Sequence, residues 1–324
     1  MSRASGITVV IVSYFTGPLL ERSLTTARDQ DGVEEIILVD NGNWPGAAEE
    51  AIAAAKEAAP GGPDIVLVQG QGNVGFAAAC NLGVARARTS LLLFLNPDAV
   101  LTPGAAQALV DHVGVRAEPW VVAPKLVNPD GAEQQGSRRA ILTPWRAFIE
   151  ATRLYKLAPN HPYFRRFNLH NEPCPDDLTE VQVISGACFL VPKDDYERIG
   201  GMDERYFLHV EDVDFCLRFA RAGGVILFDP NVRVVHFKSS SRVGSLKVEA
   251  RKISSTNKYF RTHFADPYPP GFLLIVAAAL WTMFGLKLAA AAVRGALASI
   301  GLRSRRGGDA VRRAQKISAN KSSR

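Results

Sequence analysis

The chain of 324 residues has few cysteines, and none of them has the spacing that a cysteine-based site requires. The four cysteines lie far apart, and no Cys-x-x-Cys pair occurs. This excludes the usual zinc and thiol–disulfide motifs and predicts reduced thiols inside a cytosolic protein. We also expect no secretory signal, because residues 1–6 lead directly into a strand-like segment without a long apolar run.

A basic face is missing from most of the chain. The formal net charge is +6, but residues 303–324 contain eight Lys or Arg and one Asp, so the first 302 residues carry about −1. Nucleic-acid-binding domains usually have a basic face on the folded body, and we therefore expect no nucleic-acid partner. A basic tail that follows an apolar segment instead favours the anionic lipids of a cytoplasmic membrane leaflet.

The first 125 residues alternate continuous apolar runs with helical patterns. Such a sequence predicts an α/β fold in which a mostly parallel sheet is covered by helices. Ligands of these sheets bind at the carboxyl ends of the strands. Thr102 and Pro103 are residue types that often begin a helix. We expect strands at 7–13, 35–39, 65–68 and 91–95, helices at 19–28, 47–59 and 74–87, and a further helix that begins at Thr102–Pro103.

The regular alternation stops after residue 127 and resumes later. Residues 128–180 are rich in Pro, Arg, His and aromatic residues, and we interpret them as an irregular insertion with short helices. Regular patterning returns at 181–191, and later segments predict strands at 225–228 and 232–237 and helices at 212–222 and 246–263. We therefore divide a domain at 1–266 into a nucleotide-binding half (1–127), the insertion (128–180) and an acceptor and catalytic half (181–266).

The C-terminal part consists of an apolar segment (267–302) and a basic tail (303–324), which we expect to be disordered. Fifteen apolar residues from Phe272 to Leu286 precede Lys287, whereas a helix that spans a bilayer needs about 20. A membrane-lying or re-entrant helical hairpin and a spanning helix are both open, and a soluble helical cap is a third alternative. The first two predict attachment to a membrane.

Polar residues follow the predicted strands at the edge where ligands bind. Asp40 can accept hydrogen bonds from a base or a ribose, although Asp-Asn-Gly is also an ordinary turn sequence. The glycine-rich segment 71–76 precedes a helix, and the free N–H groups of a helix start favour an anion. Its spacing fits neither a dinucleotide fingerprint nor a P-loop. Asp98 with Asn96 suits a divalent cation that keeps waters and diphosphate oxygens as its other ligands.

A second group of polar residues follows the insertion. Glu211, Asp212 and Asp214 cluster at a predicted helix start. Carboxylates there interact favourably with the helix dipole, but one that points into a cleft can also remove a proton from an acceptor hydroxyl. His236 ends an apolar strand, where it is either a packed side chain or, together with Asp98, a metal ligand.

In this order, the segments resemble a family 2 glycosyltransferase with the GT-A fold, a Rossmann-like α/β fold. The resemblance covers about residues 7–263 and points to the rhamnosyltransferase-like enzymes of bacterial polysaccharide assembly. In one departure, Asn96 replaces the first Asp of the family's Asp-x-Asp motif, which removes a negative charge and predicts weaker metal binding. The matching segments are Val39–Asn41, Asn73–Phe76 with Asn81, Asn96–Asp98, Glu211–Asp214 and His236.

The resemblance implies an inverting, metal-dependent transfer of a sugar from a nucleotide-sugar to a lipid-linked saccharide at the cytoplasmic face of a membrane. A dTDP-sugar such as dTDP-rhamnose and a UDP-sugar are both open as donors. Asp212 takes the position of the general base with Glu211 beside it, and Asp98 and His236 hold Mg²⁺ or Mn²⁺. The predicted acceptor contacts are Ser185, Gly186 and Asp214, and the predicted donor contacts are Ser13, Tyr14, Asp40, Asn73, Gly75, Phe76, Asn81, Asn96 and Asp98.

Two other functions stay open. A sugar nucleotidyltransferase would need a glycine-rich basic loop after the first strand, but residues 13–18 have no basic side chain and the next one is Arg22. A catalytically weakened glycan-binding or scaffold relative is kept open by Asn96. The sequence assigns no donor sugar, linkage or oligomeric state.

Overall fold

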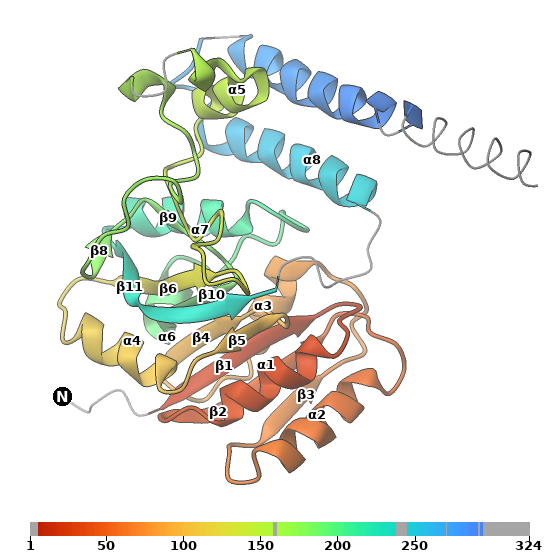
Figure 1. The fold of residues 1–324 in the computed structure, drawn as a ribbon, viewed down its shortest axis with the longest axis vertical. Helices are drawn as coiled ribbons and strands as arrows, with labels where there is room; N and C mark the ends of the chain where they lie inside the picture. The colour runs from red at the N-terminus through yellow and green to blue at the C-terminus, as the bar shows by residue number, and fades with distance from the viewer. Residues whose placement is uncertain (1–5, 158–160, 238–244, 270, 291, 294–324) are drawn as a thin grey trace, which may run out of the picture.

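A mixed nine-stranded sheet lies at the centre of the part of the chain that the structure describes (Figure 1). The computed structural model describes residues 6–157, 161–237, 245–269, 271–290 and 292–293. In spatial order the strands are β3 (Ile65–Val68), β2 (Val33–Asp40), β1 (Ile7–Ser13), β4 (Leu91–Leu95), β10 (Cys188–Pro192), β6 (Trp120–Val127), β11 (Val225–His236) and β5 (Ala99–Leu101), with β8 (Thr179–Glu180) paired to β11.

Helices cover both faces of this sheet. One core contains the side chains of Ile7, Val9 and Ile11 from β1, and the other contains Val10 and Val12, because successive strand residues point to opposite faces. Strands that are buried on both faces are expected to be apolar throughout, and every residue of β4 is indeed buried. The first core includes residues of α1 (Leu19–Arg28), α2 (Ala47–Ala58) and α4 (Ala105–Val113), and the second includes residues of α3 (Phe76–Val84), α6 (Lys193–Arg198) and α7 (Glu211–Arg221).

The strands β1, β2, β3 and β4 pair in parallel, and so do β6 and β11. This confirms the predicted α/β fold with a mostly parallel sheet. Three strands pair antiparallel: β5 and β8 with β11 at the edge of the sheet, and β10 inside the sheet between β4 and β6. The first residue of β10, Cys188, therefore pairs with the last residue of β4, Leu95. The residues just before β10 consequently lie at the carboxyl end of β4, where a ligand is expected.

Two local predictions are wrong. The helix α4 begins at Ala105 after Gly104, which has a left-handed backbone (φ +72°), and Thr102 does not cap it. The Thr102 hydroxyl donates instead to the carbonyl of Arg233 at 2.8 Å. The two strands expected at 225–228 and 232–237 form the single strand β11, whose pairing with β6 shifts register after Asp229.

The residues after β6 contain short elements, as predicted for an irregular insertion. The helix α5 (Pro144–Thr152) begins with the expected capping chemistry, because the Thr143 hydroxyl accepts a hydrogen bond from Arg146 N and Pro144 occupies the first turn. The other elements are β7 (Arg138–Arg139), which pairs with β9 (Val183–Ile184), and the 3₁₀ helices η1 (Leu154–Lys156) and η2 (Pro162–Phe164). The division of residues 1–266 at 127 and 180 stays a prediction.

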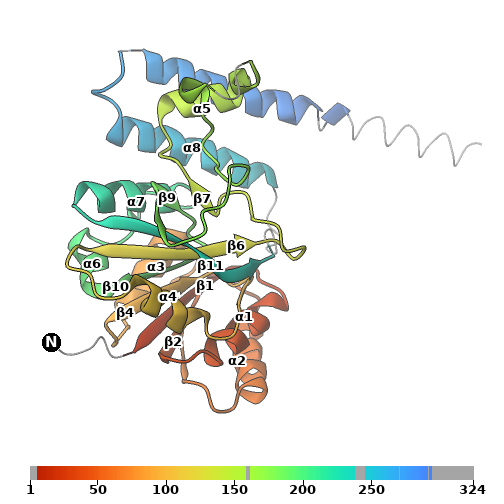
Figure 2. The ribbon, with the colours of Figure 1, turned by 60° about the vertical axis from the view of Figure 1, so that its left-hand side comes forward.

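A further layer of helices lies beyond α7 (Figures 1 and 2). It consists of α5, α8 (Ser245–His263) and a C-terminal helix (Phe272–Ala290). Among the described residues, this C-terminal helix is the one that is long and apolar enough to cross a membrane, with a mean hydropathy of 2.0. The predicted continuation of the apolar segment to residue 302 and the basic tail lie outside the described residues.

Candidate functional site

The carboxyl end of β2 is tied to the loop before α3. Asn41 is buried, and its Nδ2 donates to Asn73 Oδ1 at 3.2 Å and to the Gly75 carbonyl at 3.3 Å. Its Oδ1 accepts a hydrogen bond from Val74 N at 3.1 Å. These bonds bring three of the predicted donor residues, Asp40, Asn73 and Gly75, to one place on the sheet edge.

Asp40 forms the turn that follows β2. Its Oδ1 accepts hydrogen bonds from Gly42 N at 2.9 Å and Asn43 N at 2.8 Å. Ser13 is fully buried, and its hydroxyl accepts a hydrogen bond from Asn43 Nδ2 at 2.5 Å. The turn chemistry of Asp40 is therefore confirmed, and the Ser13 side chain supports that turn instead of reaching a donor as predicted. A donor contact of Asp40 stays a prediction.

Three aromatic rings lie beside this turn. The Tyr14 ring meets the Phe15 ring edge-on, with centroids 4.7 Å apart, and the Phe15 ring meets that of Trp44 at 5.3 Å. Trp44 is 66% exposed although it is large and apolar. The side chains leave an aromatic surface next to Asp40, of the kind on which a planar base can stack.

The start of α3 is covered by the chain before α7. The N–H of Phe76 donates to the Phe207 carbonyl at 3.0 Å. Gly75 has φ +91°, and a Cβ atom there would come within 2.7 Å of the same carbonyl oxygen, so only glycine fits. The first N–H of the helix is thus used within the protein, and binding of an anion by the other N–H groups of the helix start stays a prediction.

Asn81 joins α3 to the segment before α7. Its Oδ1 accepts hydrogen bonds from the Tyr196 hydroxyl at 2.6 Å and Met202 N at 3.1 Å. Its Nδ2 donates to the Met202 carbonyl and to Glu204, both at 2.9 Å. Because both ends of the side-chain amide are used within the protein, Asn81 has a structural role, and its predicted donor contact stays a prediction.

Asp98 and His236, which we call the metal pair, meet at the ends of β4 and β11. His236 Nε2 lies 3.0 Å from Asp98 Oδ1, and each residue is less than 9% exposed. The two side chains meet because β5 pairs with β11 in a register that places Ala99, the residue after Asp98, opposite His236. Asn96 Nδ2 lies 3.4 Å from the same ring nitrogen.

Gln134 determines which nitrogen of His236 carries a proton. Its Nε2 lies 2.9 Å from both the His236 carbonyl and Asn128 Oδ1, and it must donate to a carbonyl. Its Oε1 is therefore the atom 2.6 Å from His236 Nδ1, so Nδ1 donates. In a neutral ring, the Nε2 lone pair then faces Asp98, and two acceptors at this distance need a cation or a proton between them.

The metal pair fits a divalent cation that takes most of its ligands from elsewhere. The described residues contain no group of three or more His, Cys, Asp or Glu side chains that could hold a metal ion. A hard cation held by Asp98 and His236 would therefore complete its coordination with water and diphosphate oxygens. A cation bound in this way needs few carboxylates from the protein, which agrees with the presence of Asn96 where the family motif has an Asp.

Asp212 begins α7 and faces the strand β7. Arg139 Nη2 lies 2.5 Å from Asp212 Oδ2, which also accepts a hydrogen bond from Gly186 N at 3.0 Å. Asp212 Oδ1 accepts from Val213 N at 2.8 Å. The Arg139 guanidinium lies over the Phe167 ring, 5.5 Å from its centroid. The carboxylate is thus held between a cation and two backbone N–H groups.

Glu211 and Asp212 have opposite pKa shifts. Burial raises the pKa of Asp212, but Arg139 and the Gly186 N–H lower it, and its net pKa is below the usual range. Burial and then the charge of Asp212 raise the pKa of Glu211 to about 8. At neutral pH, Asp212 is therefore an ionised proton acceptor, whereas Glu211 is mostly protonated and adds no second charge.

Replacing Glu211 by glutamine should stabilise the protein at alkaline pH. Because the pKa of Glu211 is raised from 4.5 to about 8, its contribution to stability is intact below pH 4.5 and is lost as the pH rises through 8. Glutamine resembles the protonated acid and avoids this loss. We expect a gain in unfolding free energy of about 1 kcal/mol or more at alkaline pH and little change near pH 4.5. Denaturant unfolding at both pH values checks this.

The exposed residue Glu57 provides a control for that experiment. Glu57→Gln removes the same charge from the outer surface of α2 and should give no comparable dependence on pH. A gain for Glu211→Gln that is equal at acid and alkaline pH would contradict the raised pKa.

Asp214 has a structural role. It is fully buried, with Oδ2 accepting a hydrogen bond from Arg218 Nε at 2.6 Å and Oδ1 lying 2.6 Å from His263 Nε2. These contacts tie α7 to α8 and leave no accessible oxygen for a saccharide. They correct the predicted acceptor contact of Asp214. Ser185 stays a candidate, since it is only partly buried and precedes Gly186.

The metal pair and Asp212 lie on one continuous set of contacts. Gly186 N donates to Asp212, and the next residue, Ala187, accepts a hydrogen bond from Asn96 N at 2.8 Å. The Asn96 side chain in turn lies beside His236. Segments that are far apart in the sequence therefore converge at the carboxyl end of β4, as the strand-end pattern predicted.

The family model of Glycosyl transferase family 2 matches residues 8–198, which is more than half of the chain. The chain belongs to this family. Among curated relatives, it is 28% identical over 247 residues to N-acetylglucosaminyl-diphospho-decaprenol L-rhamnosyltransferase of Mycobacterium tuberculosis, covering 72% of this chain and 76% of the relative. It is 36% identical over 59 residues to rhamnosyltransferase WbbL of Escherichia coli strain K12, covering 18% of this chain and 22% of the relative.

Two solved structures have a similar fold. GalNAc-T7, solved with UDP, GalNAc and Mn²⁺, superposes with a TM-score of 0.58 at 14% identity, over 82% of this chain and 49% of that protein. The mannosyltransferase PcManGT from Pyrobaculum calidifontis, in complex with GDP-Man and Mn²⁺, gives a TM-score of 0.54 at 17% identity, over 89% of this chain and 75% of its own. These matches support the GT-A fold that the sequence motifs predicted.

Two residues of this family 2 glycosyltransferase site were not identified from the sequence. Gln134 and Arg139 both lie in the insertion 128–180, which sequence analysis interpreted only as irregular. The polar run from Gln134 to Arg139 ahead of an apolar segment is the one signal, and its spacing identifies no partner. Their roles depend on His236 and Asp212, which are each more than 70 residues away.

The backbone just before Glu211 and Asp212 of this glycosyltransferase is strained. His209 and Val210 have φ angles of +65° and +74°, a region that non-glycine residues seldom adopt and β-branched residues such as valine least of all. Such residues cost about 1–3 kcal/mol each and often lie at functional sites. Here the left-handed turn directs the chain into α7, so that Glu211 and Asp212 face the sheet edge instead of solvent.

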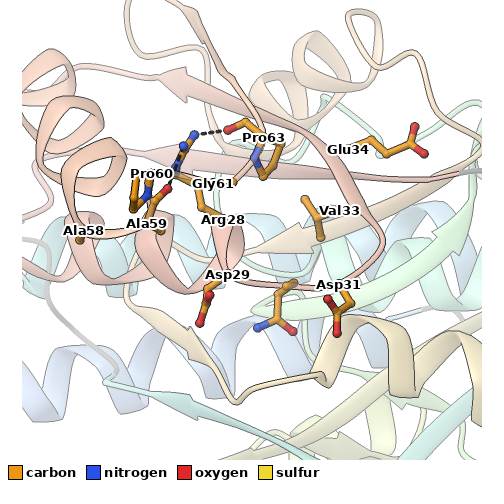
Figure 3. A pocket seen from close by; sticks show the side chains of 12 residues that line it. Arg28, Asp29, Asp31, Val33, Glu34, Ala58, Ala59, Pro60, Gly61 and Pro63 are labelled. Atoms are coloured by element: carbon orange, nitrogen blue, oxygen red, sulfur yellow. Dashed lines mark hydrogen bonds between the residues drawn. The ribbon is translucent and has the colours of Figure 1, made fainter.

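A hollow of about 630 Å³ lies at the opposite edge of the sheet, where β2 and β3 begin (Figure 3). Its most prominent side chain, Arg28, donates to the carbonyls of Ala59 and Pro63 and so closes the connection between α2 and β3. Because ligands of such sheets bind at the carboxyl ends of the strands, this hollow is not part of the glycosyltransferase site.

Proposed function

We propose that this family 2 glycosyltransferase is an inverting enzyme that transfers a sugar from a nucleotide-sugar to a lipid-linked saccharide. The observation that carries the proposal is the contact path from Asp212 through Gly186 and Ala187 to Asn96 and His236. It joins an ionised carboxylate to a pair of residues suited to a divalent cation. These are the two functions that transfer from a nucleotide diphosphate requires.

In the proposed reaction, the acceptor hydroxyl oxygen forms a bond to the anomeric carbon on the face opposite the diphosphate. The bond from that carbon to the diphosphate oxygen breaks, and its electron pair leaves with the nucleotide diphosphate. Asp212 takes the hydroxyl proton, and its Arg139 contact keeps it ionised for this purpose. The transition state resembles an oxocarbenium ion, and a single displacement inverts the anomeric configuration.

Asp98 and His236 would hold Mg²⁺ or Mn²⁺, and the bound ion would stabilise negative charge on the diphosphate. Gln134 orients the His236 ring toward this place. Asn96 contributes a hydrogen-bond donor without a charge. The presence of Mn²⁺ in both structurally similar proteins supports this choice of ions.

The names of the relatives support a particular donor and acceptor. One relative is named for rhamnosyl transfer to N-acetylglucosaminyl-diphospho-decaprenol, and another is named a rhamnosyltransferase. We therefore propose rhamnose from dTDP-rhamnose as the transferred sugar and a saccharide on a polyprenyl diphosphate as the acceptor. The exposed apolar C-terminal helix supports attachment to a membrane, and we propose the cytoplasmic face because nucleotide-sugars would be met there.

A panel of dTDP-, UDP- and GDP-sugars tests this function with the purified full chain. We expect one donor to raise the melting temperature and to be consumed only with Mn²⁺ or Mg²⁺ and a lipid-linked N-acetylglucosaminyl diphosphate. NMR of the product should show the inverted anomeric configuration. Formation of pyrophosphate from a nucleoside triphosphate and a sugar 1-phosphate would instead show a nucleotidyltransferase, and binding without turnover would show a scaffold protein.

A further inference from the structure

The C-terminal helix is attached to the catalytic domain along one of its faces. Val276 is fully buried in the core, and Leu273 and Leu280 pack against the same core. These residues are three and four positions apart, so they lie on one side of the helix. On the same side, Lys287 Nζ lies 3.4 Å from Glu249 Oε2 of α8. The helix therefore runs beside α8 (Figures 1 and 2).

Aromatic contacts attach the beginning of the helix to α5. The Phe272 ring stacks on Tyr268 with centroids 5.3 Å apart and meets Phe148 of α5 at 6.2 Å. Phe148 in turn stacks with Trp145, which meets the exposed ring of Tyr163. The helix thus has contacts near its start, at its centre and near its end, which define one orientation on the domain.

The opposite face of the helix is exposed and has no charge. Leu274, Ile275 and Leu286 are 67%, 57% and 59% exposed, and Trp281 is 44% exposed. Lys287 is the single charged residue between Phe272 and Ala290, and it lies on the side of α8. The exposed residues of the helix, other than this lysine, are Leu274, Ile275, Ala278, Trp281, Thr282, Gly285, Leu286, Ala289 and Ala290. Water-facing helices normally carry charges on this side, so something apolar must cover it.

We infer that this outward face lies in the surface of a lipid bilayer, with the helix parallel to the membrane plane and not across it. A helix that spans a bilayer alone contacts lipid on all sides, but one side of this helix packs against the catalytic domain. To cross a bilayer, the helix would have to pull Val276 out of the core and separate Lys287 from Glu249. An in-plane helix keeps these contacts and buries only its apolar face.

Charge and aromatic residues favour a membrane over a second protein copy as the occupant. Eight basic residues follow the apolar segment in the sequence, and anionic lipids attract such clusters. Trp281 and Tyr163 are exposed, and both residue types favour the membrane–water interface. The inference deepens the proposed function, because the membrane surface is where a lipid-linked acceptor would be bound. The role of the helix in binding this acceptor rests on the proposed function, whereas the membrane contact itself does not.

Vesicle flotation with the full chain tests the inference. We expect binding to vesicles of mixed phosphatidylcholine and phosphatidylglycerol, and at least a tenfold weaker partition for Ile275→Glu with Leu286→Glu, since each change removes apolar area from the outward face. Val115→Glu is the matched control, because Val115 is an exposed apolar residue too but lies in the loop after α4, away from this helix. It should bind like the unchanged protein.

A thiol reporter distinguishes the in-plane from the spanning arrangement. In a Cys174→Ser, Ser318→Cys chain bound to closed vesicles, a membrane-impermeant maleimide should label residue 318, because the tail stays on the side of the catalytic domain. Protection of residue 318 until the vesicles are opened would overturn the inference and show a spanning helix. Equal flotation of the double variant and the unchanged protein would overturn it too.

Sedimentation without lipid tests the other occupant. A dimer that Ile275→Glu converts to a monomer, together with no vesicle binding, would replace the bilayer by a second copy of the chain. Donor consumption with a water-soluble acceptor analogue is measured in parallel. If the unchanged protein consumes the donor in this assay but binds no vesicles, the inference about the helix is wrong while the proposed transfer stands.

Discussion

Replacing Asp212 by asparagine should reduce the rate of sugar transfer by about 10²–10⁴-fold, the usual contribution of a general base. The amide keeps the size of the side chain but cannot take the proton of the acceptor hydroxyl. Donor binding should change little, because Asp212 lies on the acceptor side of the contact path that leads to the metal pair. Single-turnover transfer measures the first effect, and calorimetric titration with the nucleotide-sugar measures the second.

The control must separate catalysis from stability. Asp212→Asn leaves the buried Arg139 without its anion, so some loss of stability is expected, and rates have to be compared well below the melting temperature. Asp64→Asn is the matched change, since the Asp64 side chain is 93% exposed at the other edge of the sheet. If Asp212→Asn keeps more than about a tenth of the normal rate, the base is another residue.

The second large effect should come from the metal pair. We expect His236→Ala and Asp98→Asn each to weaken the apparent affinity for Mn²⁺ by about 100-fold or more, because each removes one of two protein ligands. Gln134→Ala should cost about 10–100-fold, since it only releases the ring of His236. Donor consumption as a function of Mn²⁺ concentration, and Mn²⁺ binding in the presence of the nucleoside diphosphate, provide two independent measurements.

His112 provides the control for these substitutions. It also pairs with an aspartate, Asp229, at 2.6 Å, but on α4 and away from the strand ends. His112→Ala should leave the metal dependence unchanged. A metal requirement that is the same in His236→Ala and in the unchanged protein would remove the metal pair from the proposed site.

The elements of the first half could be predicted because their signals are local. The helix Leu19–Arg28 and the strand Leu91–Leu95 begin and end at the predicted residues. Each follows from a change between apolar runs and helical spacing within a few residues. The start of α4 was misplaced because Thr102 finds its partner in Arg233, and no local pattern shows that contact.

The direction and place of β10 could not be predicted in the same way. Its apolar residues identify a strand, but nothing within 188–192 shows that it runs antiparallel between β4 and β6. This placement is what brings Gly186 beside Asp212 and Ala187 beside Asn96. The site therefore depends on a pairing between residues that are about 90 positions apart.

The functional residues divide by the kind of partner they have. That Asp98 and His236 lie together could be predicted because they end strands, and the sheet brings such ends together. The polar side chains of Ser13, Asn81 and Asp214 have the same residue types, but they bond to Asn43, Tyr196 and Arg218 inside the protein. Sequence patterns do not separate a buried polar contact from a ligand contact, because both use the same chemistry.

The position of β10 also has a consequence for how the chain matures during synthesis. Until residue 192 has been made, β4 lacks one neighbour and shows an unpaired edge of five apolar residues, of the kind to which other chains add. At about 5–20 residues per second, the ribosome needs about 5–20 s to cover the gap between these strands. The nascent chain thus has an aggregation-prone strand edge for several seconds before the active site can form. Its expression should therefore depend on chaperones more than that of proteins in which each strand pairs with one made shortly before it.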